Sequence, residues 1–399
     1  MRMQWIPMIT LIIINLGIDT ALWRWLRHKK HGKLLSGMHA AATVAMLALI
    51  VTTLCLPNRT ASDSTFVCIL WMLYTYLSVS ISRLVAVVLW QLGRLCRPRS
   101  TARTTVHGIA AALGIALLGA MWWGALVTPY TVNVERVNIE SAKLPASFDG
   151  MRVVQISDLH LGTYGTDTTA VSTFVDSVNA LKPDIIFFTG DLVSRRTSEA
   201  EPFKHVLARL HAPHGVISIL GNHDYDDYST WPTEREKMAD RQALVDFQHD
   251  LGWQLLRNAT ATVAIGNDTI DVIGAENYGD PPFPTYGSLR ATHNDLQNGR
   301  YKILLQHNPY EWHADVAGKT PVDLTLSGHT HAMQIMVTIM GHRYSPAYFR
   351  YHEWGGRYDE GNQVLYVNIG LGMVGMPMRI GATPEITLIT LKHGTKTSN

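Results

Sequence analysis

Four long apolar segments within residues 1–127 constrain this chain more than any other feature. Each of them is near or above the roughly 20 residues that cross a hydrocarbon core as a helix. A signal peptide would account only for the first segment, and residues 1–5 are hardly the basic start that a signal peptide has. We therefore expect a four-helix membrane unit in an integral, multi-pass membrane protein. The segments run from Ile6 to Trp23, Leu34 to Leu56, Phe66 to Leu92 and Gly108 to Val127.

The basic residues between these segments predict the orientation of the membrane unit. Residues 24–33 and 94–103 are rich in arginine and lysine, whereas residues 57–65 contain only Arg59. Because positive charge collects on the cytoplasmic side, the first two loops should be cytoplasmic. An even number of crossings then places both ends of the chain, with residues 128–399, on the extracytoplasmic side.

Two charged residues interrupt the apolar segments. Asp19 and Arg83 lie at similar depths from the expected cytoplasmic ends of their helices, so they could form a buried ion pair of functional use. In the other reading, Arg83 extends toward the headgroups and Asp19 lies near the interface. A transporter that carries an accessory domain is an alternative for the whole chain, although no pair of segments has the broken, repeated pattern of transporters.

The remaining residues have the texture of a globular domain. We expect a linker and first strand over 128–150, a catalytic domain over 151–392 and a tail over 393–399. In the first half, apolar strands alternate with helices, which predicts a largely parallel sheet; in the second half strands predominate. The predicted fold class is α/β, with two sheets packed face to face as a β-sandwich flanked by helices. The expected helices cover 168–181, 199–210 and 233–251, and the first strands cover 152–157, 184–189 and 216–220.

Charge and cysteine content exclude several functions. A net charge of +2 with 17% charged residues gives no clustered basic face, so we expect no nucleic-acid partner. The three cysteines, Cys55, Cys68 and Cys96, all lie in or beside the apolar segments. A thiolate zinc site or a disulfide framework is therefore excluded from residues 128–399, and a metal there must be bound by His, Asp, Glu or Asn.

Each of several apolar strands is followed by polar residues that a core would not accept. The carboxyl ends of parallel strands line one crevice, so these side chains should converge. Such a set suits two divalent ions that share one carboxylate, and Asp191 is the natural bridging ligand because it stands alone between neighbouring clusters. In extended backbone, Asp-x-His and His-x-His would direct alternate side chains to the same side. The residues concerned are Asp158, His160, Asp191, Asn222, His223, Asp224, His307, His329 and His331.

The order of these clusters resembles the calcineurin-like metallophosphoesterase family, and within it the membrane-anchored branch. The motifs Asp-x-His, Gly-Asp, Gly-Asn-His-Asp, His and Gly-His-x-His occur in that order between Met151 and Leu391. The resemblance implies a phosphoric ester hydrolase in which His223 contacts the phosphate and protonates the leaving oxygen, and Asp224 orients His223. It also implies one metal on Asp158, His160, Asp191 and His331, and a second on Asp191, Asn222, His307 and His329. The chain departs from many members of the branch after His331, where it has Ala332-Met333 in place of two glycines.

Metal and substrate are less constrained. Ligands of nitrogen and oxygen without sulfur favour Mn²⁺, Zn²⁺ or Fe. A domain tethered to the bilayer meets lipid headgroups at high effective concentration, so we expect a phosphate ester of an envelope phospholipid or glycolipid. Alternatives are a UDP-2,3-diacylglucosamine-type pyrophosphatase, against which the predicted orientation argues, and a phosphate-binding sensor or scaffold without turnover. Six methionines near the last motif could form an apolar rim for acyl chains or could fill the core: Met333, Met336, Met340, Met373, Met376 and Met378.

Overall fold

The computed structural model describes residues 5–98, 100–279, 284–287, 289 and 298–394. The chain forms two compact units, one of residues 1–123 with 375–377 and one of residues 124–374 with 378–399. Most of the expected tail, residues 395–399, lies outside the described residues.

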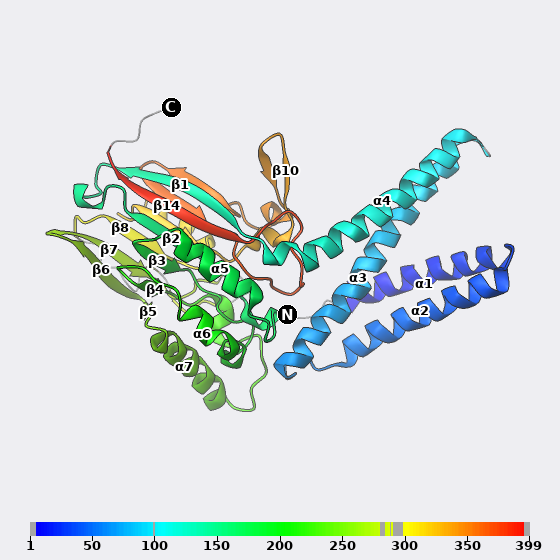
Figure 1. Ribbon diagram of the computed structural model, residues 1–399, viewed down its shortest axis with the longest axis horizontal. Helices are drawn as coiled ribbons and strands as arrows, with labels where there is room; N and C mark the ends of the chain where they lie inside the picture. Colours follow the sequence, from blue (N-terminus) through cyan, green and yellow to red (C-terminus); the bar gives the residue numbers. More distant parts are fainter. Residues whose placement is uncertain (1–4, 99, 280–283, 288, 290–297, 395–399) are drawn as a thin grey trace. The chain divides into compact units, whose positions relative to one another are not determined.

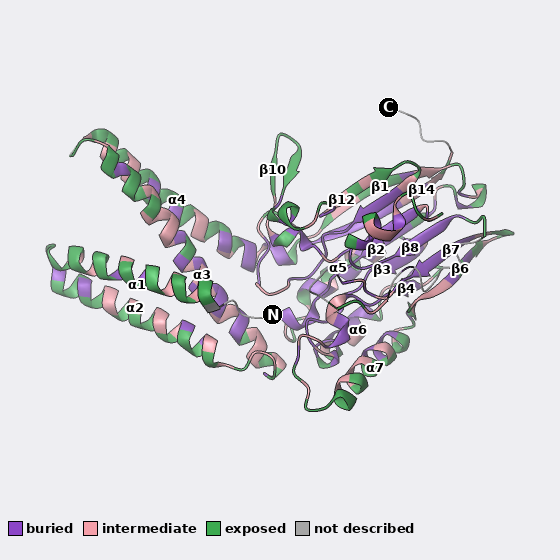
Figure 2. Ribbon diagram, turned by 180° about the vertical axis from the view of Figure 1, so that it is seen from behind, coloured by how far each residue is buried: buried purple, intermediate pink, exposed green. Residues whose placement is uncertain are grey.

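Four helices make up the N-terminal unit, and all four are long and apolar enough to cross a membrane. Many of their apolar side chains point outward, such as Ile6 and Val44, which are 81% and 65% exposed. Figure 2 shows these helices mostly in the colours of exposed and intermediate residues. A helix surface of this kind suits lipid rather than water, and the prediction of four membrane helices is confirmed. The helices are α1 (Trp5–Arg27), α2 (Gly32–Cys55), α3 (Asp63–Leu92) and α4 (Thr101–Leu126).

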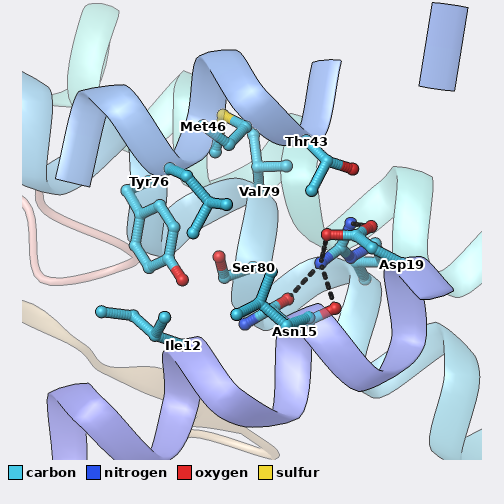
Figure 3. A pocket seen from close by; sticks show the side chains of 11 residues that line it. Ile12, Asn15, Asp19, Thr43, Met46, Tyr76, Val79 and Ser80 are labelled. Carbon is cyan, nitrogen blue, oxygen red and sulfur yellow. Dashed lines mark hydrogen bonds and ion pairs between the residues drawn. The ribbon is translucent and has the colours of Figure 1, made fainter. Parts of the chain in front are cut away.

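The two charges inside the apolar segments form the ion pair that was one of the two readings. Arg83 of α3 binds the carboxylate of Asp19 and donates to Oδ1 of Asn15 over 2.5 Å, both on α1. On α2, Nε2 of His39 lies 3.1 Å from the carbonyl oxygen of Asp19. The pair borders a small cavity of about 20 Å³ that is also lined by Tyr76 (Figure 3). These polar contacts link α1, α2 and α3.

The second unit contains two six-stranded sheets and a separate hairpin. In the first sheet every neighbouring pair is parallel except β14–β2 (Figure 1). Its order is β1 (Asn133–Ser141), β14 (Glu385–His393), β2 (Arg152–Ile156), β3 (Ile185–Phe188), β4 (Val216–Ser218) and β5 (Gln254–Leu255).

The second sheet is parallel in its centre and antiparallel at both edges. Its order is β12 (Gly356–Glu360), β13 (Gln363–Val367), β9 (Leu324–Ser327), β8 (Lys302–Leu305), β7 (Asp268–Gly274) and β6 (Ala259–Ile265). The hairpin of β10 (Val337–Ile339) and β11 (His342–Tyr344) projects from the domain (Figure 1).

The two sheets pack face to face around one apolar core. Val153 and Phe187 of the first sheet and Val272 and Leu326 of the second belong to the same buried cluster. Helices α5 (Thr169–Ala180) and α7 (Glu234–Asp250) contribute buried side chains to the cluster on the outer face of the first sheet. The predicted α/β sandwich flanked by helices is confirmed.

One predicted helix is wrong in its extent. Residues 199–210 form two 3-10 turns and the single turn of α6 (Lys204–Leu207) instead of one continuous helix. The carboxylate of Glu199 accepts the backbone N–H groups of Ser194 and Arg195, so it closes a loop rather than beginning a helix. The apolar residues Phe203, Val206 and Leu207 of this stretch are nevertheless buried in the core.

Candidate metal centre

The side chains that follow the strands lie together in two overlapping groups of donor atoms. One group consists of Asp158, His160, Asp191 and His331, and the other contains Asp191, His307 and His329; within each, one donor atom per residue lies within 4.8 Å of the others. Asp158 comes two residues after β2, Asp191 three after β3, His307 two after β8 and His329 two after β9. The carboxyl ends of strands in both sheets thus supply one site.

In the first group, three side chains meet at short distances. Nε2 of His331 lies 3.1 Å from Oδ1 of Asp158 and 3.0 Å from Nε2 of His160. Two ring nitrogens at that distance repel each other when both carry a hydrogen, whereas one cation can use the lone pair of each. The donor set therefore fits a divalent ion.

In the second group, Asn222 joins the two histidines. Its Oδ1 lies 3.1 Å from Nε2 of His307 and 2.8 Å from Nδ1 of His329. Its amide nitrogen donates to the hydroxyl of Tyr228 over 2.8 Å, so the oxygen rather than the NH₂ faces the histidines. Nδ1 of His307 donates to the carbonyl of Thr189 over 2.7 Å, and this leaves Nε2 to face the site.

Asp191 belongs to both groups. Its Oδ2 lies 3.4 Å from Nε2 of His160 and 3.2 Å from Nε2 of His307. A carboxylate placed between two sets of imidazoles is what a bridging ligand between two cations requires.

The backbone presents these side chains differently from the sequence-based expectation. Five of the candidate ligands have positive φ: Asp158 (55°), His160 (44°), Asp191 (59°), His329 (74°) and His331 (50°). The expected extended backbone through Asp-x-His and His-x-His is therefore wrong. Left-handed residues turn each side chain sharply into the site, and such strain is typical of functional centres.

Two glycines leave room for the carboxylates. A Cβ atom on Gly221 would collide with the carboxylate of Asp191, and one on Gly328 would collide with the side chains of Ser157 and Asp158. Gly190 has a φ of 95°, which other residues rarely adopt. Gly221 and Gly328 are therefore explained by the side chains that lie close to them, and Gly190 is explained by its backbone conformation.

The left-handed stretch continues past His331. Ala332, Met333 and Gln334 have φ of 50°, 47° and 60°. The sequence departs from the family branch at Ala332 and Met333. A glycine would adopt the left-handed conformation at these two positions without strain, whereas alanine and methionine are strained in it.

Asp224 has a different role from the expected one. Its carboxylate accepts four backbone N–H groups, at 2.9 to 3.2 Å, from Asp191, Leu192, Val193 and Gly221. The expectation that Asp224 orients the imidazole of His223 is therefore wrong. Asp224 is a positioning residue for the turn that carries Asp191.

His223 is held by other partners. Its Nδ1 donates to the carbonyl of Ser194 over 2.7 Å, and its ring stacks on Tyr228 with centroids 3.7 Å apart. Burial lowers the pKa of His223 to about 3, so the ring is neutral near pH 7 in the metal-free protein. With Nδ1 occupied, Nε2 is the atom that can meet a ligand.

Burial and neighbouring charges shift the pKa values of the clustered carboxylates and of His307 in opposite directions. Burial would raise the pKa of both Asp158 and Asp191, but the surrounding histidines hold it below its ordinary value. Burial acts to lower the pKa of His307, yet Asp191 outweighs it and raises that pKa to about 9. A raised pKa favours a proton on His307, which a cation bound there would displace.

Sequence reasoning did not anticipate several supporting residues. The hydroxyl of Tyr351 lies 3.0 Å from Nε2 of His329. The fully buried Arg379 donates to the carbonyls of Ile369, Gly372 and Ala382 and lies 3.2 Å from Nδ1 of His331. Tyr351 stands in a loop that contains no motif residue, and Tyr228 lies four residues after a motif to which it does not belong, so no sequence signal marks either of them.

Two facing sheets with carboxylate, amide and imidazole donors at their strand ends define a metallophosphoesterase. The sequence model of the family described as calcineurin-like phosphoesterase matches residues 151–333. The uncharacterized metallophosphoesterase YkuE of Bacillus subtilis is 32% identical over 299 residues, which cover 72% of this chain and 95% of that protein.

Two further relatives agree. UDP-2,3-diacylglucosamine pyrophosphatase LpxG of Chlamydia trachomatis is 30% identical over 71% of this chain and 97% of its own length. A transmembrane protein with metallophosphoesterase domain from Danio rerio is 33% identical over 73% of this chain, which spans only 63% of that protein. The chain belongs to the calcineurin-like metallophosphoesterase family and is a membrane-anchored, metal-dependent phosphoester hydrolase.

Proposed function

We propose that this enzyme hydrolyses the phosphate ester of an envelope phospholipid or glycolipid at a dinuclear metal centre. One ion would be held by Asp158, His160, Asp191 and His331. The other would be held by Asp191, Asn222, His307 and His329. The single observation that supports this assignment is the shared Oδ2 of Asp191, which faces imidazoles of both groups.

The chemistry divides between the ions and the chain. When bound, two divalent ions supply hydroxide from water near neutral pH and neutralise charge on the phosphoryl oxygens. Mn²⁺, Zn²⁺ and Fe all suit a donor set of nitrogen and oxygen. His223 presents Nε2 to the phosphate, and the negative charge of the ester favours the imidazolium that can protonate the leaving oxygen.

Support for a lipid substrate comes from an exposed apolar surface that follows His331 in the chain. Met340 at the tip of the hairpin is 96% exposed and Phe349 is 92% exposed. Apolar side chains exposed in this number are typical of a surface that contacts lipid or protein. We call the exposed apolar side chains of residues 333–349 the apolar ridge; they are Met333, Val337, Ile339, Met340, Tyr344, Tyr348 and Phe349.

The expected methionine rim is smaller than the sequence suggested. Met333 and Met340 are exposed, whereas Met373 and Met378 are buried. Met336 and Met376 are half-buried. The core therefore takes two of the six methionines, and the ridge relies on aromatic and β-branched residues as well.

Metal dependence is tested with purified protein stripped of metal by a chelator. Added Mn²⁺ should restore hydrolysis of bis-p-nitrophenyl phosphate, and the Asp191→Ala variant should stay inactive. Stripped and reloaded protein that are equally inert would favour a phosphate-binding sensor or scaffold.

The lipid substrate is tested by comparing rates on a phospholipid or phosphorylated glycolipid in mixed micelles with rates on the soluble diester. Replacing both Met340 and Phe349 with serine should lower the ratio of micellar to soluble rates several-fold. Met238, which is 61% exposed on α7, provides the matched control as Met238→Ser. An unchanged ratio in the Met340/Phe349 variant would argue against lipid.

A second candidate is a UDP-2,3-diacylglucosamine pyrophosphatase, which the similarity to LpxG favours. That reaction would place the catalytic domain on the cytoplasmic side, opposite to the orientation that we propose from the basic loops. A reporter fused after residue 399 separates the two. An extracytoplasmic signal supports the envelope lipid, and a cytoplasmic signal supports the nucleotide-linked lipid.

A further inference from the structure

A second group of metal-binding side chains lies outside the catalytic cluster. Nε2 of His313 is 2.5 Å from Oε1 of Glu353, and Nδ1 of His352 is 2.6 Å from the same oxygen. These three ligand atoms lie within 4.8 Å of one another. The motifs that carry the phosphoesterase chemistry include none of these residues.

The surroundings of the group combine a buried anchor with two accessible rings. The side chain of Glu353 is 7% exposed, whereas those of His313 and His352 are 54% and 73% exposed. His313 belongs to a π-helix, Trp312–Val316, an irregular turn that is often found at functional sites. The carboxylate is thus fixed and the imidazoles can adjust around an incoming ion.

The charge of Glu353 also needs a partner. Within the described part of the chain, its carboxylate makes hydrogen bonds and ion pairs with these two histidines and with no arginine or lysine. A neutral imidazole offers a hydrogen bond but no charge, and an anion held in this way is costly to bury. A divalent cation would supply the charge and use both ring nitrogens.

We propose that His313, His352 and Glu353 bind a third divalent ion of the zinc class. Two imidazole nitrogens and one carboxylate oxygen are a set that Zn²⁺ accepts, with a fourth position left for water because the rings face solvent. The absence of thiolate from the set disfavours Cu(I), and two nitrogens among three ligands disfavour Mg²⁺ and Ca²⁺.

The site lies beside residues that contact the catalytic cluster. Tyr351, immediately before His352, contacts His329 through its hydroxyl over 3.0 Å. On the other side, the carbonyl of Trp354 accepts from the hydroxyl of Thr330. An ion on His352 and Glu353 would therefore fix the segment from residue 351 to 354, and with it the support of the loop that carries His329.

The test counts zinc on the full-length protein in detergent. Chelator-stripped protein is dialysed against Zn²⁺ and its zinc content is measured in four forms: wild type, His313→Ala/His352→Ala, Glu353→Gln and the control His249→Ala. His249 is exposed on α7, so the control removes a surface histidine that lies outside the proposed site. Because His313 and His352 are exposed, their replacement should leave the fold intact, which the far-ultraviolet circular dichroism spectrum of each metal-stripped form verifies.

The difference in zinc content between forms decides the question, whatever number of ions the catalytic cluster holds. We expect the double variant and Glu353→Gln to bind one equivalent less than wild type, and His249→Ala to match wild type. Zinc should also raise the melting temperature of wild type more than that of the double variant. Equal zinc contents in wild type and double variant would overturn the proposal and leave these contacts as hydrogen bonds alone.

Discussion

The backbone N–H of His223 donates to Oδ1 of Asp191 over 2.8 Å. One oxygen of this carboxylate is thereby committed to the chain, while Oδ2 faces the imidazoles of both ligand groups. Because Asp224 holds the backbone N–H of Asp191 at the same time, the orientation of the Asp191 carboxylate is fixed from two directions.

Asp224→Asn should weaken metal binding. An amide in this place would turn an NH₂ group toward backbone N–H donors that now meet a carboxylate oxygen, and the turn carrying Asp191 would shift. Replacing a residue that supports a metal ligand typically lowers the affinity for the metal by about 10- to 100-fold. Competition with a chromophoric chelator for Mn²⁺ measures the change. Asp250→Asn, at the exposed end of α7, is the matched control. Equal affinities of Asp224→Asn and wild type would show that Asp224 does not position the site.

His223→Ala should slow hydrolysis according to the leaving group. Loss of a general acid costs about 10²- to 10⁴-fold for a leaving alkoxide that needs a proton. A nitrophenolate leaves without one, so its rate should fall less. Rates for an alkyl and a nitrophenyl ester of the same phosphate, compared with those of the exposed-residue control His214→Ala, give the measurement. A loss of equal size for both esters would exclude the acid role.

Met333→Gly should stabilise the protein. A side chain at positive φ costs about 1–2 kcal/mol, and the greater freedom of glycine in the unfolded chain offsets about 0.5–1 kcal/mol of that relief. A net gain of up to about 1.5 kcal/mol in the free energy of unfolding is expected. Met333 is 43% exposed, so its replacement removes a side chain that is only partly buried. Thermal unfolding of the variant measures the gain, while Met238→Gly in the middle of α7 should destabilise instead. A lower melting temperature for Met333→Gly would mean that its side chain supports the loop.

Glu385 makes stability depend on pH. Burial raises the pKa of Glu385 from the ordinary 4.5 to about 7. The folded state then holds the proton more tightly than the unfolded state, so this contribution is present below about pH 4.5 and is lost as pH rises through 7. Glu385→Gln keeps an acceptor for Tyr366 and Thr387 but cannot ionise. The melting temperature of Glu385→Gln relative to that of wild type should therefore be higher at pH 8 than at pH 5. A gap that is the same at both pH values would contradict this account.

Much of the site could be predicted because each motif follows an apolar strand that is visible in the sequence. Apolar strands bury both faces, so a run such as residues 185–188 is visible in sequence, and the polar residue that follows it must lie at the strand end. Parallel pairing then brings Asp158, Asp191 and Asn222 to one edge.

The local backbone could not be predicted in the same way. Left-handed φ at Asp158 and His331 depends on contacts made from elsewhere, and neither residue type requires it. The role of Asp224 depends on the N–H groups of residues 191 to 193, which are more than thirty residues away in the chain. The hairpin of β10 and β11 was missed because all its strand residues are exposed, so burial imposes no pattern on it.

Anomalous X-ray scattering from crystals of the Mn²⁺-loaded protein tests the central claim most directly. Two peaks are expected inside the cluster, one among Asp158, His160 and His331 and one among Asn222, His307 and His329, with Asp191 between them. A single peak, or manganese bound only elsewhere, would contradict a dinuclear centre built from these residues.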